Sequence, residues 1–178
     1  MESFKFLLKK GSTICTTVNG STVLMEAVSR NRLDFVEYLV QNADKLGLDV
    51  RVRDKRGSNA LFYAASVGNT AIFHRLFEAG CTAENDSVSR TVFMQAALNG
   101  HVDMLRYLAV NADTLGIKLE QTDNDGRNAL FYGYVSVRLY RALDITLALT
   151  YVRKLVLLSL NFRYGFLVRS LKTSGTRT

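Results

Sequence analysis

Apolar residues recur along this chain at helical spacing, in short segments that come in pairs. The first segments of the pairs are GSTVLMEAV, GSNALFYAA, SRTVFMQAA and GRNALFYGY. The second segments are FVEYLV, IFHRLF and MLRYLA, and a small or polar pair separates each from the segment before it. An apolar residue at every third or fourth position predicts one buried face for each segment. The pattern therefore predicts an all-α fold built from pairs of short helices.

The chain also repeats itself over a longer distance. Residues 40–65 return as residues 109–132, with an offset of 69 residues. Four anchor positions divide the chain into shorter units of 37, 32 and 37 residues: Gly20, Gly57, Ser89 and Gly126. Self-similarity at a fixed period is typical of a solenoid, in which each unit covers the apolar face of its neighbour. Such an array presents a long surface without a built-in pocket, which favours a binding module over an enzyme.

Polar and small residues mark the predicted helix ends. The N-cap position of each first helix carries a side-chain oxygen that can accept from unpaired backbone N–H groups: Thr22, Asn59, Thr91 and Asn128. Gly68 and Gly100 suit a left-handed residue that closes the first helix. Asp54, Asp86 and Asp123 precede the anchors and predict turns.

These features, in this order, resemble the ankyrin repeat family, and DKRGSNALFYAASVGN and SRTVFMQAALNGH carry its pattern. The family proline is replaced by Val23, Ala60, Val92 or Ala129, and the family histidine by Met25, Phe62, Met94 or Phe131. The resemblance implies a solenoid of helix-turn-helix units with short hairpin-like loops over residues 1–132. It divides them into a partial repeat at 1–19, repeats near 20, 57 and 89, and a truncated one near 126. It also implies that His101 satisfies backbone groups of a loop.

The repeat pattern stops at Gly133, because Gly133 and Tyr134 stand where the repeat has alanines. Residues 133–178 are therefore predicted to be a basic, apolar, non-ankyrin tail, for example from a retained intron, an alternative exon or a faulty gene model. The alternative is a diverged cap or an appended helix with an apolar seam at Leu139, Leu143, Leu147, Tyr151 and Leu155. The opening residues read as a second helix, so we expect the chain to begin in mid-repeat.

The net charge of +7 lies entirely in the tail. Residues 1–132 carry 15 basic and 15 acidic residues, whereas residues 133–178 carry 8 basic residues and one acidic residue. The repeats thus lack the global basic field that nucleic-acid binding requires. Arg153 and Lys154 argue against a membrane span over residues 145–162. Two cysteines far apart in sequence fit a reducing compartment, so we expect a cytoplasmic protein, with the nucleus as an alternative.

No local motif predicts catalysis or metal binding. His74, His101, Cys15 and Cys81 lack the close paired spacing of a zinc site. The chain has no glycine-rich phosphate loop of the required form, and no nucleophile with a positioned base can be assembled locally. We therefore expect no enzyme activity, no cofactor, no metal and no small-molecule substrate.

The resemblance implies a protein partner that contacts the loop tips and the exposed face of the first helices. It nominates Arg30, Lys55, Arg56, Ser58, Ser66, Val67, Arg90, Leu98, Asn99 and Arg127. A row of arginines near successive tips would suit an acidic or phosphorylated segment, and the alternative is that these are solvated surface charges. The leading hypothesis is a protein-interaction module. The alternatives are a piece of a larger ankyrin-containing kinase or receptor, and tail-mediated binding to acidic membranes or nucleic acid.

Overall fold

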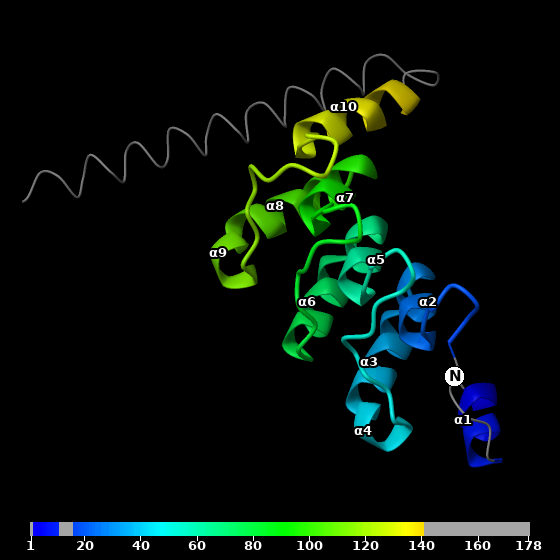
Figure 1. Ribbon diagram of the computed structural model, residues 1–178. Helices are drawn as coiled ribbons and strands as arrows, with labels where there is room; N and C mark the ends of the chain where they lie inside the picture. The colour runs from blue at the N-terminus through cyan, green and yellow to red at the C-terminus, as the bar shows by residue number, and fades with distance from the viewer. Residues whose placement is uncertain (1, 11–15, 141–178) are drawn as a thin grey trace, which may run out of the picture.

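The computed structural model describes residues 2–10 and 16–140, and all regular elements in these residues are helices (Figure 1). The first helices of the repeats are α2 (Val23–Ser29), α5 (Ala60–Val67), α7 (Val92–Leu98) and α10 (Ala129–Tyr140). The second helices are α3 (Leu33–Gln41), α6 (Thr70–Glu78) and α8 (Val102–Val110), preceded by α1 (Glu2–Lys9). The all-α prediction is confirmed. Of the predicted tail, residues 141–178 lie outside the described residues.

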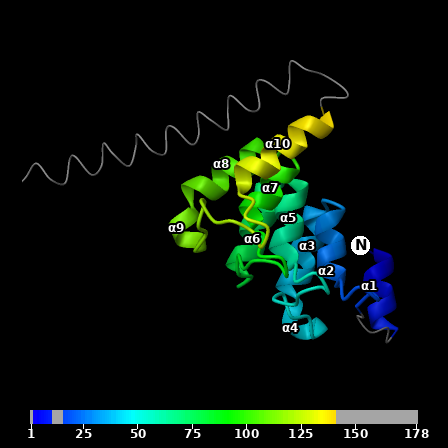
Figure 2. The same cartoon turned by 45° about the horizontal axis from the view of Figure 1, so that its top comes forward.

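The helices stack in two layers along the array (Figures 1 and 2). Helices α2, α5, α7 and α10 contact one another in sequence to form one layer, and α3, α6 and α8 form the other. Each second helix packs against the first helix of its own repeat. Helix α1 continues the second layer, since the ring of Phe4 lies 4.9 Å from that of Phe35 on α3. The structure is thus a helix-turn-helix solenoid.

The long loops that return at the 69-residue offset each contain one helical turn. These turns are α4 (Ala43–Leu46) and α9 (Ala112–Leu115), and each ends at a left-handed glycine, Gly47 or Gly116. Both follow directly on a second helix, α3 or α8.

The predicted N-caps are present on all four first helices. Thr22 and Thr91 accept the backbone N–H groups of Met25 and Met94 at 3.2 and 3.1 Å. Asn59 and Asn128 do the same for the first turns of α5 and α10. A cap of this kind stabilises a helix by about 1 kcal/mol, which matters because α2 and α7 are only 7 residues long.

The core lies between the two layers and follows the predicted pattern with three differences. Phe35 on α3 and Phe93 on α7 were expected in the core but are only partly buried. Buried alanines on the first helices allow close packing: Ala27, Ala64, Ala65, Ala96 and Ala97. On α6 the sequence predicts Ile72, Leu76 and Phe77 as core, but Phe77 is only partly buried, and Phe73 is fully buried in addition. The reason is that α6 also packs against α8, where the Phe73 ring lies 5.8 Å from that of Tyr107.

The anchor residues adopt left-handed backbone conformations, which explains the preference for glycine at three of the four positions. Gly57 has φ +76°, and a Cβ there would lie 2.7 Å from the backbone nitrogen of Ser87 in the next turn. Ser89 occupies the same position in the third repeat with φ +63°. A left-handed conformation costs a residue with a Cβ about 1–2 kcal/mol. The third turn is therefore strained where the others are not.

Replacing Ser89 with glycine should relieve this strain. We expect Ser89→Gly to raise the free energy of unfolding by about 0.5–1 kcal/mol, because the gain exceeds the extra flexibility of the unfolded chain. Gly57→Ala is the opposing control and should lower it by more than about 1 kcal/mol. Urea denaturation followed by circular dichroism measures both. A lower stability for Ser89→Gly would contradict this reading of the turn.

Candidate functional site

Three of the four turns that precede a first helix are organised around a buried carboxylate, and the turn before Gly20 has the exposed Thr17 at that position. Asp54 Oδ1 accepts the backbone N–H groups of the residues two and four positions later, Arg56 and Ser58, at 2.8 and 2.9 Å. Asp86 and Asp123 make the same pair of bonds in their own turns, at 2.8–3.0 Å. The predicted structural role of these aspartates is confirmed.

Backbone hydrogen bonds join successive tips into one continuous edge. The amide of Lys55 donates to the carbonyl of Asn19 at 3.0 Å, and the amide of Ser87 donates to that of Arg56 at 2.9 Å. The amide of Asn124 donates to Val88 O at 3.1 Å. Backbone hydrogen bonds therefore link the tips of four repeats into one edge.

The arginines near these tips are not equivalent. Arg90 Nε and Arg127 Nε each lie 2.8 Å from the second carboxylate oxygen of the buried aspartate in their own turn, Asp86 or Asp123. Each of these two guanidinium groups therefore binds the carboxylate of its own turn. Arg127 is held further by an ion pair with Asp125. The predicted row of guanidinium groups along the tips is thus interrupted at the third and fourth turns.

Arg56 differs in position, because it follows its aspartate by two residues, whereas Arg90 and Arg127 follow theirs by four. The Tyr63 hydroxyl donates to Asp54 Oδ2 at 2.8 Å, and Arg56 Nε stays 3.7 Å from the same oxygen with its side chain 71% exposed. Neighbouring Lys55 is also exposed, and its side chain makes no ion pair or hydrogen bond with any described residue. The second turn therefore presents two adjacent positive charges to solvent.

The tyrosines that contact the turn carboxylates were not predicted from the sequence. Tyr63 and Tyr132 stand at equal positions in GSNALFY and GRNALFY, and both donate to an aspartate nine residues earlier. That shared position is the signal that would have found them. Gln95 occupies it in the third repeat, and its Oε1 is buried without a hydrogen-bond partner in the described residues.

The remaining predicted site residues differ in exposure. Ser58 is buried, with 6% of its surface exposed. Its backbone amide donates to Asp54 Oδ1. Ser66, Val67, Leu98 and Asn99 are partly exposed on α5 and at the end of α7. Arg30 is exposed and pairs with Glu26 at 2.6 Å. His101 Nε2 lies 2.8 Å from the carbonyl of Ser66, which confirms its predicted role at the loop backbone.

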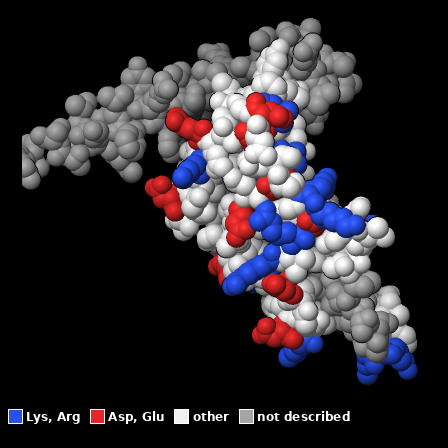
Figure 3. All heavy atoms as spheres, in the orientation of Figure 1, with Lys and Arg blue, Asp and Glu red and all other residues white. Residues whose placement is uncertain are grey.

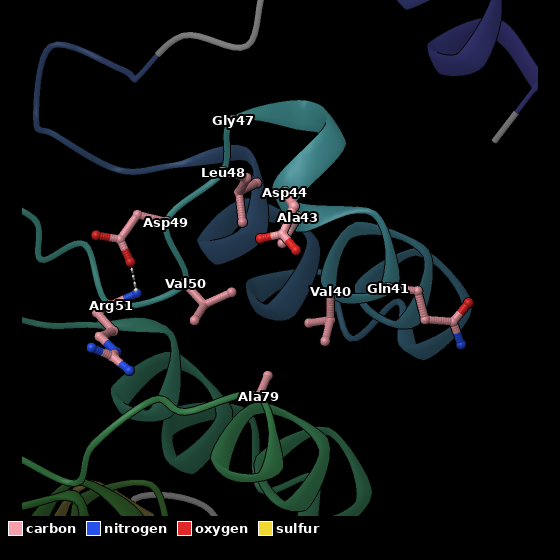
Figure 4. Close-up of a pocket in the computed structure, with 10 residues that line it drawn as sticks. All are labelled: Val40, Gln41, Ala43, Asp44, Gly47, Leu48, Asp49, Val50, Arg51 and Ala79. Atoms are coloured by element: carbon pink, nitrogen blue, oxygen red, sulfur yellow. Dashed lines mark hydrogen bonds between the residues drawn. The ribbon is translucent and has the colours of Figure 1, made fainter.

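Figure 3 shows basic and acidic side chains interspersed over the face it draws, with basic side chains gathered over the middle of the array. A separate hollow lies at the first long loop, between α4 and the end of α6 (Figure 4). This pocket of about 650 Å³ has apolar walls from Val40, Leu48, Val50 and Ala79, with carboxylates among the residues that line it. The pocket is open to solvent, and none of the turn aspartates lines it.

The turn of the fourth repeat shows how the protein tunes its carboxylates. Burial alone would raise the pKa of Asp123, but hydrogen bonds from the Tyr132 hydroxyl, from Arg127 and from the turn backbone outweigh it and hold the pKa well below its usual range. Burial, together with the bond to Asp123, raises the pKa of Tyr132 to about 12. The aspartate is therefore charged and the tyrosine neutral at all physiological pH values.

Within the described residues, no cluster of His, Cys, Asp and Glu could hold a metal ion. No helix in this part of the chain is long and apolar enough to cross a membrane.

Comparison with known proteins gives consistent matches. A family model described as ankyrin repeats (3 copies) matches residues 1–86 and 61–145. Ankyrin repeat domain-containing protein 63 is 32% identical over 121 residues in both Mus musculus and Homo sapiens, covering 65% of this chain and 30% or 31% of those proteins. Protein VAPYRIN-LIKE of Medicago truncatula is 30% identical over 102 residues, covering 57% of this chain and 21% of its own length. The chain thus spans a third or less of these relatives.

The contribution of Tyr132 to the fourth turn can be measured through pH. Because the pKa of Asp123 is depressed in the folded state, its stabilisation is present above the unfolded aspartate pKa and is lost as pH falls below it toward the folded value. Tyr132→Phe removes one cause of the depression. We expect it to lower the urea midpoint at pH 7, and the deficit relative to wild type to shrink near pH 2, as Asp123 becomes protonated in the folded variant before it does in wild type.

The matched control is Tyr134→Phe, which removes the same hydroxyl from a side chain that is 52% exposed. It should leave the midpoint unchanged at both pH values. A Tyr132→Phe deficit that stays constant from pH 7 to pH 2 would show that its hydroxyl does not act through the carboxylate.

Proposed function

The chain belongs to the ankyrin repeat family, and on that premise we propose that it is a non-catalytic module that binds a protein partner along its loop tips and first helices. Ankyrin repeat domains generally bind proteins, and solenoids offer extended surfaces for doing so. The observation that carries the more specific proposal is the exposed pair Lys55 and Arg56 in the second turn.

We define the basic tip as Lys55 and Arg56 together with Tyr63, Ser66 and Val67, which follow on α5. Arg56 Nη2 lies 3.3 Å from the Tyr63 hydroxyl, which in turn lies 3.4 Å from Ser21 Oγ of the preceding repeat. The basic tip thus combines two cations, hydroxyl groups and an apolar side chain within one strip. A guanidinium fork beside an ammonium group suits carboxylate or phosphate oxygens.

The partner proposed from this chemistry is an acidic or phosphorylated protein segment. Arg30 on one side and Leu98 and Asn99 on the other would extend the contact to the neighbouring repeats. Arg90, Arg127 and Ser58 belong to the turns, so we assign them to support of the surface rather than to direct contact. The pocket at the first long loop would be a second contact edge.

The proposal places this binding inside the cell, in the cytoplasm or nucleus. Cys81 fits such a setting as a structural thiol, because it is buried and its Sγ donates to Val50 O at 3.0 Å. Burial raises the pKa of this thiol to about 12, so it stays protonated and unreactive.

The test uses an array of acidic 15-residue peptides, each made with and without a phosphoserine. We expect the full chain to bind a subset of them, with affinity that falls as salt rises, and Lys55→Glu/Arg56→Glu to weaken that binding more than tenfold. Fluorescence anisotropy on the selected peptides measures the affinity.

The control is Lys9→Glu/Lys10→Glu, which makes the same charge change on exposed residues at the start of the array. It should leave the affinity within about twofold, by the distance dependence of screened charges. Equal losses in the two double variants would mean that only net charge matters and would overturn the basic tip as the site.

A further inference from the structure

Helix α10 has one buried and one exposed face. Its buried face packs against α7 and carries residues at helical spacing: Ala129, Tyr132, Gly133 and Ser136. The opposite face carries Leu130, Phe131 and Tyr134, which are 52%, 45% and 52% exposed. We call these three residues the α10 face. Three large apolar or aromatic side chains side by side on one helix form an apolar patch at the end of the array.

The same positions are buried in the inner repeats. Phe131 corresponds to Met25, Phe62 and Met94, all of which are 3% exposed or less. Tyr134 corresponds to Val28, Ala65 and Ala97, all of which are 0% exposed. The fourth repeat thus keeps side chains suited to a covered position, and the exposure arises from the missing cover.

Helices α2, α5 and α7 each have a second helix of their own repeat and a following first helix against them, and among the described residues α10 has neither. Those helices stop near a residue with positive φ eleven positions after the anchor, namely Asn31, Gly68 or Gly100, and the second helix then folds back. In the fourth repeat that position is Val137, whose branched side chain disfavours positive φ. Helix α10 runs on to Tyr140, so among the described residues it has no second helix of its own repeat against it.

The chain itself supplies a candidate cover of suitable chemistry. Residues 141–178 follow directly on α10 and carry Leu143, Leu147, Tyr151 and Leu155 at a spacing of four, which is one apolar stripe in helical register. Charge also favours this pairing. Residues 102–132 at the end of the array carry five acidic and three basic residues, whereas residues 141–178 carry seven basic and one acidic.

We propose that the C-terminal segment 141–178 docks on the α10 face and closes the apolar end of the array, with the stripe from Leu143 to Leu155 as the contacting surface. Solenoids need a terminal unit that shields their last apolar interface. A segment without the repeat pattern would serve here in place of a second helix. The other occupants of this face, a second copy of the chain or a separate protein, are distinguished by the experiment.

Limited proteolysis of the full chain tests the docking. Trypsin cleaves after Arg153 and Lys154, which lie inside the proposed contact stripe. We expect these sites to be protected in the wild type and to be cut at least tenfold faster in Phe131→Ser/Tyr134→Ser, which removes the apolar contacts without adding a trypsin site. The control is Phe6→Ser, which removes an aromatic ring that is 59% exposed at the other end of the array. It should leave the cleavage rate unchanged.

Two further measurements keep the result interpretable. Hydrogen exchange of the α10 amides shows whether the helix still packs on α7 in the double variant, as we expect. Light scattering after gel filtration gives the mass in solution, which should be that of a monomer in all three proteins. Equal cleavage rates in wild type and double variant would overturn the proposal. A dimer that dissociates on substitution would also overturn it, because a second copy would then be the occupant.

Discussion

The array depends on a buried carboxylate in the second, third and fourth inter-repeat turns. Asp54, Asp86 and Asp123 are all less than 8% exposed, and each accepts two backbone N–H groups through one oxygen. A short turn has few other ways to satisfy its own amides, and a buried charge is tolerated only where such bonds surround it. The carboxylate therefore fixes the turn, the turn places the N-cap, and the N-cap starts the first helix.

The second carboxylate oxygen decides what each tip offers to a partner. Arg90 and Arg127 bind this oxygen in the third and fourth turns, so their positive charges are paired within the protein. In the second turn Tyr63 donates to this oxygen, and Arg56, which lies at a different position of the turn, is exposed beside Lys55. The residue after the anchor is Ser58 in the second turn, where the third and fourth turns have Arg90 and Arg127, so this turn has no arginine on its carboxylate from that position. The basic tip follows from local turn chemistry, without any change in the fold.

Most of the fold could be predicted from the sequence, because caps, glycines and apolar spacing are local and repeat in order. The four N-caps, the left-handed anchors and the contact of His101 all follow from single positions. Phe73 was missed because its burial depends on the neighbouring helix α8. The candidate site was less predictable. The sequence shows arginines near three tips, but their pairing with aspartates four residues earlier depends on the three-dimensional path of the turn.

The central claim is that arginines near the tips divide into those that hold a turn and one that faces solvent. Urea denaturation of Arg56→Ala, Arg90→Ala and Arg127→Ala tests it most directly. The account predicts a lower free energy of unfolding for Arg90→Ala and Arg127→Ala, each of which uncovers a buried carboxylate, and wild-type stability for Arg56→Ala. Equal losses in all three variants, or a loss confined to Arg56→Ala, would contradict it.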